Sequence, residues 1–247
     1  MEEKMTKERE QKYERIELTP LRLAIANRMT ESKTTIPHAA TKIGIDVTAL
    51  VRVRSVLKNQ WINEKGFCPT PFAFTAFAAV KAIANHGLIN SSFYGSHIAG
   101  FADCNLAVTM EVADKGLMAP VIHKAQTMSF WEFAKILHEL TQKAKAGDVR
   151  GMRFQDATFT VNNTGAYGSE DGYAVIMPPQ AAILTVRKIA KTPVVTEEGG
   201  EERIVVRSIM PISLSFDHRI MDGKEATGYL LNIRELIEKG GCFDALE

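Results

Sequence analysis

The chain has 247 residues, of which 45% are hydrophobic and 24% charged, a composition typical of a globular protein with a sizeable core. Its formal net charge of +1 gives no general attraction to nucleic acid or to a membrane surface, and its first fifteen residues are too charged for a signal peptide. No apolar run reaches the roughly 18 residues that a spanning helix needs. Cys68, Cys104 and Cys242 fit neither a disulfide framework nor a zinc site, so we expect a reducing cytoplasm, or the mitochondrial matrix in a eukaryote.

The first third of the chain is predicted to be mainly helical. Residues 1–16 form a charged arm of mixed sign, which we expect to be a linker outside the folded domain. Thr19 and Pro20 suit the cap and the first turn of a helix that continues to about Ser32. A strand over 42–47 and helices over 48–60 and 71–86 follow, and the last helix is apolar enough to be fully buried.

The remainder interleaves strands and helices. Strands are predicted over 105–112 and 117–122 around a turn at 114–116, followed by a helix over 129–146 that opens with a capping box. Strands over 157–162 and 181–189, a hairpin tip at 197–203, a strand or strand pair over 204–216 and a helix over 222–239 complete the pattern. Because no strict βαβ rhythm is present, we expect a mixed α/β fold with a largely antiparallel or mixed sheet.

One stretch, SFDHRIMDGKEATGYL at 215–230, joins the last strand to the last helix. The strand alternation ends at Phe216, so His218 begins the turn. Asp222 stands at a cap position with Glu225 three residues later, which suits a structural role as well as a functional one. Spacing alone favours His218 as a turn residue bonded to backbone. As an alternative, its imidazole, with an ordinary pKa of about 6.5, could act as a general base on a substrate thiol.

The segment DHRIMDG at 217–223 resembles the DHRxxDG signature of the catalytic domain of dihydrolipoamide acyltransferases, the core components of 2-oxo acid dehydrogenase complexes. The likeness runs in order over about residues 17–247, which we interpret as one acyltransferase domain. It implies a chloramphenicol acetyltransferase-like two-layer α/β sandwich, in which a mixed sheet packs with helices, and a homotrimer that relatives stack into 24-mer or 60-mer cages. Other resembling stretches are PLRLAIANRMTESKTTIPH, DVTALVRVRSVLK, ADKGLMAPVI, FTVNNTGAYGS and IMPPQAAILTVRKIAKTPVV.

The resemblance implies acyl transfer between dihydrolipoamide and coenzyme A in a channel between subunits. His218 would deprotonate the attacking thiol, and Asp222 would orient the site through a charged partner, for which Arg28 is the candidate. The family usually has serine or threonine as the oxyanion donor where this chain has Asn162, whose amide N–H groups could do the same. Alternatively, Asn162 only ends a strand, and Thr164 takes its place.

The resemblance also implies a coenzyme A site. Arg54 matches an arginine that contacts the cofactor in relatives, although an arginine on a helix is most often a solvated surface residue. Relatives line the cofactor channel at four further positions, which are Asn163, Ala166, Arg187 and Ile189. No metal is expected, because the remaining histidines lack ligand spacing.

Partners follow from the same resemblance. No lipoyl or subunit-binding domain is recognised in these residues, so the lipoyl group is expected from a lipoyl domain in trans or from a missing domain, alongside dehydrogenase-complex partner subunits. No nucleic-acid or membrane partner is expected. The tail GGCFDALE offers only Phe243 and Leu246 as an apolar cage anchor and departs from the leucine-rich ending common in the family.

Two other functions stay open. A chloramphenicol-type small-molecule O-acetyltransferase shares part of the signature, but Asp217, Arg219 and the Ile-Pro-His segment argue against it. A trimeric scaffold without chemistry would explain the missing serine or threonine, but His218 and Asp222 argue against that function. The VNNTG stretch leans toward branched-chain-type acyltransferases.

Overall fold

The computed structural model describes residues 14–240. Most of the predicted charged arm therefore lies outside the described residues, and so do Cys242 and the two candidate anchor residues Phe243 and Leu246. Within residues 14–240, no helix is long and apolar enough to cross a membrane.

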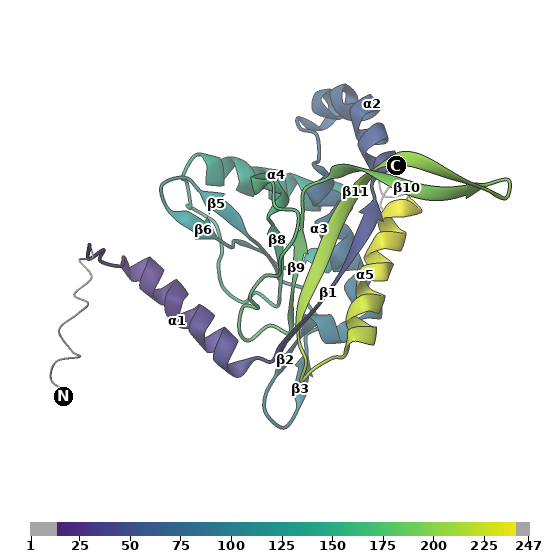
Figure 1. Ribbon diagram of the computed structural model, residues 1–247. Coiled ribbons are helices and arrows are strands. Elements are labelled where there is room, and N and C mark those ends of the chain that lie inside the picture. Colours follow the sequence, from purple (N-terminus) through teal and green to yellow (C-terminus); the bar gives the residue numbers. More distant parts are fainter. Residues whose placement is uncertain (1–13, 241–247) are drawn as a thin grey trace, which may run out of the picture.

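A mixed β-sheet forms the centre of the molecule (Figure 1). Its strand order is β1-β11-β9-β8-β4-β7, and β10 pairs with β11 outside this path. β8 runs parallel to both β4 and β9, whereas the other pairs in the sheet are antiparallel. The predicted mixed sheet is confirmed. The strands are β1 (His38–Asp46), β4 (Leu106–Val108), β7 (Val121–Ile122), β8 (Phe159–Asn163), β9 (Ala182–Val186), β10 (Ala190–Glu198) and β11 (Glu201–Asp217).

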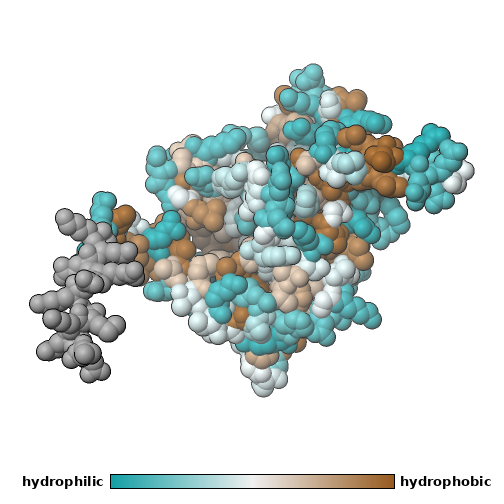
Figure 2. Space-filling model, in the orientation of Figure 1, coloured by the Kyte–Doolittle hydropathy of each residue, from teal (hydrophilic) through white to brown (hydrophobic). Residues whose placement is uncertain are grey.

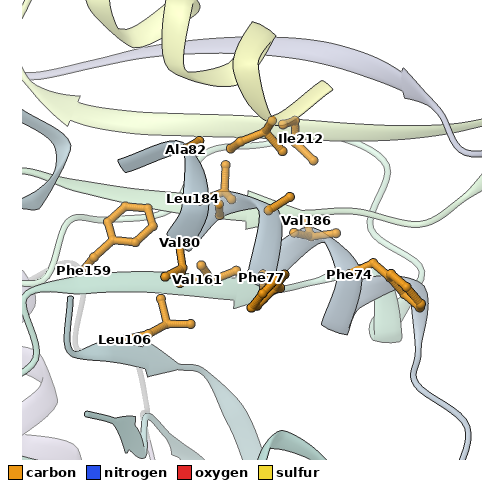
Figure 3. Close-up of a cluster of buried hydrophobic side chains, with 14 of the residues drawn as sticks. Phe74, Phe77, Val80, Ala82, Leu106, Phe159, Val161, Leu184, Val186 and Ile212 are labelled. Carbon is orange, nitrogen blue, oxygen red and sulfur yellow. The ribbon is translucent and has the colours of Figure 1, made fainter. Parts of the chain in front are cut away.

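Helices cover one face of this sheet and bury the main core. The most apolar of them is α3 (Pro71–Ala82), which is buried from Ala73 through Val80, as its composition predicts. Figure 3 shows its Phe77 and Val80 close to Val161 and Leu184 of the sheet. α5 packs on both β1 and α3, and α4 packs on α3. The other helices are α1 (Pro20–Thr35), α2 (Thr48–Lys65), α4 (Phe130–Lys145) and α5 (Gly223–Glu238).

Side-chain caps explain where three of these helices begin, and two of the caps, at Thr19 and Ser129, were predicted from the sequence. The Thr70 hydroxyl accepts a hydrogen bond from the backbone N–H of Ala73 at 3.2 Å, and the Thr19 hydroxyl does the same for Arg22 at 3.2 Å. Ser129 and Glu132 form the predicted capping box of α4, with reciprocal bonds of 2.9 and 3.3 Å. These bonds satisfy N–H groups that have no partner inside the helix, so short polar side chains fix the first residue of α1, α3 and α4.

The other face of the sheet is covered by the irregular segment 164–181, which one buried arginine holds in place. Arg187 is only 4% exposed, and its guanidinium donates to Ser169 Oγ at 3.1 Å, to Ser213 Oγ at 3.0 Å and to the carbonyl of Gly172. Burial lowers the pKa of Arg187. Since a buried charge must be hydrogen-bonded to be tolerated, this side chain ties the segment to β9 and β11.

The structure departs from the predicted strands in four places. The single strand predicted over 105–112 is two strands in different sheets, and the one over 117–122 is broken before Pro120, which has no N–H to donate. Residues 204–216 belong to one long strand, and its partner β10 was not predicted separately. The hairpin of β2 and β3 was missed. These further strands are β2 (Ser91–Phe93), β3 (Ile98–Gly100), β5 (Met110–Val112) and β6 (Gly116–Met118).

Replacing Gly165 with alanine is expected to destabilise the fold by about 1–3 kcal/mol, because the site is overpacked. A Cβ at Gly165 would lie 2.5 Å from the carbonyl carbon of Arg187 and 2.7 Å from the N of Lys188, both of which are backbone atoms. Urea unfolding measures the change. Gly87→Ala is the control, since its Cβ would meet nothing within 4 Å. Equal stability of both variants would contradict the expected clash.

Candidate active site

His218 begins the turn between β11 and α5, where its backbone N–H donates to the carbonyl of Pro37 at 3.0 Å. Its half-exposed side chain places Nδ1 3.3 Å from Asp222 Oδ1. A histidine whose Nδ1 faces a carboxylate carries its proton there and keeps Nε2 as the basic nitrogen. The structure therefore brings the two predicted signature residues together and leaves one imidazole nitrogen available to a substrate.

Asp222 also fills the structural role that its spacing predicts. It is the N-cap residue of α5, and its backbone N–H donates to Glu225 Oε2 at 3.2 Å. The two roles are compatible, because the cap bond uses the backbone N–H of Asp222 while its Oδ1 faces the imidazole of His218, and the catalytic role stays a prediction. The start of α5 thus sets the position of the carboxylate relative to the histidine.

Asp217 and Arg219, the residues before and after His218, form an ion pair with each other that fixes the turn. Asp217 is 1% exposed and accepts from the Arg219 backbone N–H at 2.9 Å and from its Nη2 at 2.6 Å. The Arg219 guanidinium also lies 4.3 Å from the ring centroid of Phe93, and its bonds to Asp217 raise the pKa of Arg219. The sequence pattern included both residues but did not assign them this role.

Replacing Asp217 with alanine is expected to lower the free energy of unfolding by about 3 kcal/mol, since it removes one partner of a largely buried ion pair. Chemical denaturation measures this effect. The matched control is Asp171→Ala, because the pair of Asp171 with Lys42 is exposed and screened by solvent, so its loss should cost much less stability than the loss of Asp217. If the two variants lose similar stability, the ion pair does not hold the turn.

His38 lies next to Asp217 in the strand register but is unsuited to act as a base. Its Nδ1 lies 2.8 Å from the carbonyl of Ile36, and its Nε2 accepts from the N–H of Ile176 at 3.1 Å. Both ring nitrogens are therefore engaged, and the tautomer with the proton on Nδ1 is fixed. Of these two neighbouring histidines, only His218 keeps a nitrogen for chemistry.

Asn162 lies near the end of β8 with its side chain half-buried. Its amide Oδ1 accepts a hydrogen bond from Thr109 Oγ1 at 2.5 Å. That bond uses the amide oxygen and leaves the two N–H donors of the same amide for another acceptor. Thr164, the alternative donor, instead places its hydroxyl against the carbonyl of Val186 and the guanidinium of Arg187, at 3.5 and 3.4 Å.

The sheet register separates His218 from Asn162 within one chain. Asn162 pairs with Thr185 of β9, and Thr185 pairs with Ser213 of β11. His218 comes five residues after Ser213, so it lies roughly 15 Å farther along the sheet and two strands away. Arg28 does not reach Asp222 in this chain either, because its guanidinium donates to the carbonyl of Pro178. The predicted pairing of Arg28 with Asp222 is therefore not formed within a single chain.

A cavity of about 500 Å³ lies at the C-terminal end of β8, and part of the predicted cofactor set lines it. Asn163 and Ala166 line it, together with Lys145 and His138 of α4. Arg54 lies at its edge, where its Nε donates to the carbonyl of Pro69, a lining residue, at 2.7 Å. Two of the predicted residues lie elsewhere: Arg187 is buried under the segment 164–181, and Ile189 packs against the main core.

A second cavity of about 390 Å³ lies between α1 and the hairpin of β5 and β6. Its lining is mainly apolar and includes Ile25, Met118 and Met177, and Figure 2 shows the apolar surface in this region. Thr109 lines both cavities, so the hydrogen-bonded pair of Thr109 and Asn162 stands beside both. Neither cavity includes His218 among its lining residues.

Cys68 and Cys104 differ in how far they are buried. Cys104 is buried, and burial raises the pKa of its thiol to about 12, so it stays protonated at neutral pH. Cys68 is half-buried in the wall of the larger cavity. Within the same residues, no group of three or more His, Cys, Asp or Glu side chains could hold a metal ion.

A protein-family model matches most of the chain. Residues 10–241 match the model of the 2-oxoacid dehydrogenases acyltransferase catalytic domain. A lipoamide acyltransferase component of the branched-chain alpha-keto acid dehydrogenase complex from Bacillus subtilis is 37% identical over 90% of this chain and 52% of its own length. The succinyltransferase component of the 2-oxoglutarate dehydrogenase complex of the same organism is 34% identical over 88% and 51%. The chain thus spans about half the length of the curated relatives it matches.

Solved structures share the whole fold. A probable dihydrolipoamide acetyltransferase from Listeria monocytogenes superposes with a TM-score of 0.84 and 36% identity, over 92% of this chain and 95% of that chain. The cubic core of a pyruvate dehydrogenase multienzyme complex also superposes with a TM-score of 0.84, over 94% of each chain, at 24% identity. The second likeness shows the fold alone. Together they confirm the predicted α/β architecture.

Proposed function

Because the chain belongs to the family of 2-oxoacid dehydrogenase acyltransferase catalytic domains, we propose that it transfers an acyl group between dihydrolipoamide and coenzyme A. The observation that carries this proposal is the contact of His218 with Asp222 inside the DHRIMDG motif. A histidine with one free nitrogen can take a proton from a thiol, whose ordinary pKa of about 8.5 is within reach of an imidazole base.

The proposed reaction exchanges one thioester for another. Nε2 of His218 takes the proton of the coenzyme A thiol, and the sulfur attacks the carbonyl carbon of acyl-dihydrolipoamide. The resulting tetrahedral oxyanion accepts hydrogen bonds from the Asn162 amide. The bond from carbon to the lipoyl sulfur then breaks, and this sulfur takes the proton back from His218. Asp222 stabilises the imidazolium between these two steps, since its carboxylate lies 3.3 Å from Nδ1.

We further propose that two subunits of a homotrimer complete each site. His218 and Asn162 are too far apart to meet in one chain, so an oxyanion donor must come to His218 from a neighbour. The helix α1 is a second argument for a neighbouring subunit. It projects from the body (Figure 1) and leaves the apolar side chains of Leu21 and Leu23 about half exposed. Stacking of trimers into a 24-mer or 60-mer cage stays a prediction, since the candidate anchor residues lie outside the described residues.

The larger cavity is the proposed coenzyme A site. Asn163 and Ala166 line it, and the guanidinium of Arg54 and the ammonium of Lys145 bring positive charge to it for the phosphates. The apolar second cavity suits the aliphatic arm of a lipoyl group, which we propose is supplied by a lipoyl domain in trans or by another part of the same protein. The Thr109–Asn162 pair stands between the two, where an acyl group would pass.

Replacing Arg54 with alanine is expected to raise KM for coenzyme A on the order of tenfold and to change kcat by less than about twofold, because a charge-assisted contact to phosphate is lost away from the reacting atoms. Steady-state kinetics with varied coenzyme A measures the effect. Arg52→Ala is the matched control, since Arg52 is exposed on the same helix. Unchanged KM in both variants would place the phosphates elsewhere.

The acyl group is proposed to be of branched-chain type. The branched-chain relative from Bacillus subtilis, which is 37% identical, favours it. Transfer to free dihydrolipoamide from acetyl-, succinyl- and isobutyryl-coenzyme A tests both the reaction and the acyl group, with isobutyryl expected to have the highest kcat/KM. A preference for succinyl-coenzyme A would support the proposed acyl transfer and rule out the branched-chain acyl group. No transfer from any of the three by a folded trimer would leave a scaffold or a small-molecule acetyltransferase as the better function.

A further inference from the structure

Thr109 occupies a position that the sequence pattern did not single out, immediately after β4. Its backbone N–H donates to the carbonyl of Val161 at 3.1 Å and continues the parallel pairing of β4 with β8. This places Thr109 beside Asn162 on the same face of the sheet. The side chains meet there, and Thr109 Oγ1 lies 2.5 Å from Asn162 Oδ1.

This contact decides which end of the amide is presented to a substrate. An asparagine amide carries a carbonyl oxygen at one end and two N–H donors at the other, and only the N–H end can stabilise an oxyanion. The hydroxyl of Thr109 donates to Oδ1 and so holds the oxygen toward β4. On the opposite side, Thr185 gives no support, because its buried Oγ1 makes no hydrogen bond with another described residue.

We propose that Thr109 is a positioning residue for acyl transfer, which fixes the Asn162 amide with both N–H donors toward the oxyanion. The inference rests on the proposed acyltransferase function and on Asn162 as the oxyanion donor. It adds a two-residue unit in which a hydroxyl from β4 orients an amide from β8, 53 residues apart in the sequence. Without the hydroxyl, the amide can rotate and present its oxygen, whose lone pairs repel the oxyanion.

The test compares wild type with Thr109→Val, Thr109→Ser, Asn162→Ala and the double variant Thr109→Val/Asn162→Ala, using dihydrolipoamide and the best acyl-coenzyme A. Thr109→Val is expected to lower kcat about tenfold and to leave KM within about twofold, because the contact of the Asn162 amide with the oxyanion, which Thr109 orients, is made only in the transition state. Thr109→Ser keeps a hydroxyl and is expected to restore most of the rate. The double variant is expected to match Asn162→Ala, because the two residues act as one unit.

The control removes a different hydroxyl from the same strand. Thr160 lies two residues before Asn162 on β8 and donates to Gln180 Oε1 at 2.6 Å, so Thr160→Val should leave kcat unchanged. Wild-type kcat for Thr109→Val beside a crippled Asn162→Ala would overturn the inference and spare the proposed function. Additive losses in the double variant would also overturn it, since they indicate a structural effect of Thr109.

A measurement that does not depend on enzyme activity separates the inference about Thr109 from the proposed acyltransferase function. Neutron crystal structures of wild type and Thr109→Val, with Thr109→Ala in reserve if valine does not fold, show which end of the Asn162 amide carries the N–H groups and where it points. Rotation of that amide in the variant is expected, and an unchanged amide with the same neighbours overturns the inference. An inactive wild type that nevertheless shows this rotation would reject the acyltransferase function and keep Thr109 as the residue that orients Asn162.

Discussion

His218→Ala is expected to lower kcat for acyl transfer by about 10²–10⁴-fold while the protein remains folded and assembled. The imidazole is the only group of the DHRIMDG turn with a nitrogen free to take the thiol proton, because Asp217 is paired with Arg219 and Asp222 faces Nδ1. Removing it leaves the thiol protonated at neutral pH. The side chain is about half exposed and its turn is held by backbone and ion-pair bonds, so the fold should tolerate alanine.

The measurement is steady-state transfer from the preferred acyl-coenzyme A to dihydrolipoamide, with native mass spectrometry to check assembly. His97→Ala is the matched control, since His97 is exposed at the β2–β3 hairpin, where its ring stacks on Tyr94 and its Nδ1 lies 3.4 Å from Ser96 Oγ, and it should retain full activity. Asp222→Asn keeps a good cap residue and removes the charge, so an intermediate loss is expected. Full activity of His218→Ala would rule out the proposed base.

A mixture of inactive His218→Ala and inactive Asn162→Ala chains is expected to regain about a quarter of wild-type activity when the two are coexpressed in equal amounts. In a ring of subunits each site takes one residue from each of two neighbours. The register of the sheet supports this proposed division, because His218 follows the end of β11 and Asn162 lies on β8, at positions that cannot meet in one chain. One site in four, on average, then receives both intact residues from random neighbours.

The control for this experiment pairs His218→Ala with the double variant His218→Ala/Asn162→Ala, which can form no intact site and should stay inactive. Native mass spectrometry must show mixed assemblies in both preparations. If mixed assemblies form and the first preparation stays inactive, then His218 and Asn162 do not build a shared site between subunits, and either the trimer or the oxyanion role of Asn162 is wrong.

Local patterns predicted most of the helices and several of the strands. Short polar caps and apolar periodicity placed α3 and α4 within a few residues of their observed ends, because these signals act over one or two turns. The strand predicted over 105–112 shows the limit of such patterns. Its two halves alternate alike, but β4 pairs in the central sheet and β5 pairs with β6, so the break at Thr109 depends on distant partners that periodicity does not encode.

The candidate site, like the fold, could be predicted where the signal is local in the sequence and not where it depends on distant partners. A compact motif located His218 and Asp222, and the structure places them in contact because they are only four residues apart across one turn. The bond between Thr109 and Asn162 depends on strand register and could not be foreseen from spacing. Arg187 shows the reverse problem: a sequence does not tell a guanidinium that binds a cofactor from one that is buried to hold a segment in place. The catalytic and cofactor roles themselves stay predictions.

The pairing of β1 with β11 has a consequence for how the chain is made. β1 occupies residues 38–46 and its antiparallel partner spans residues 201–217, near the opposite end of the chain. During synthesis β1 therefore leaves the ribosome long before its partner, and its backbone groups remain without their native ladder until β11 has emerged. Contacts of such long sequence separation slow folding and expose strand edges to aggregation. We expect a newly made chain to depend on chaperones until β11 is complete.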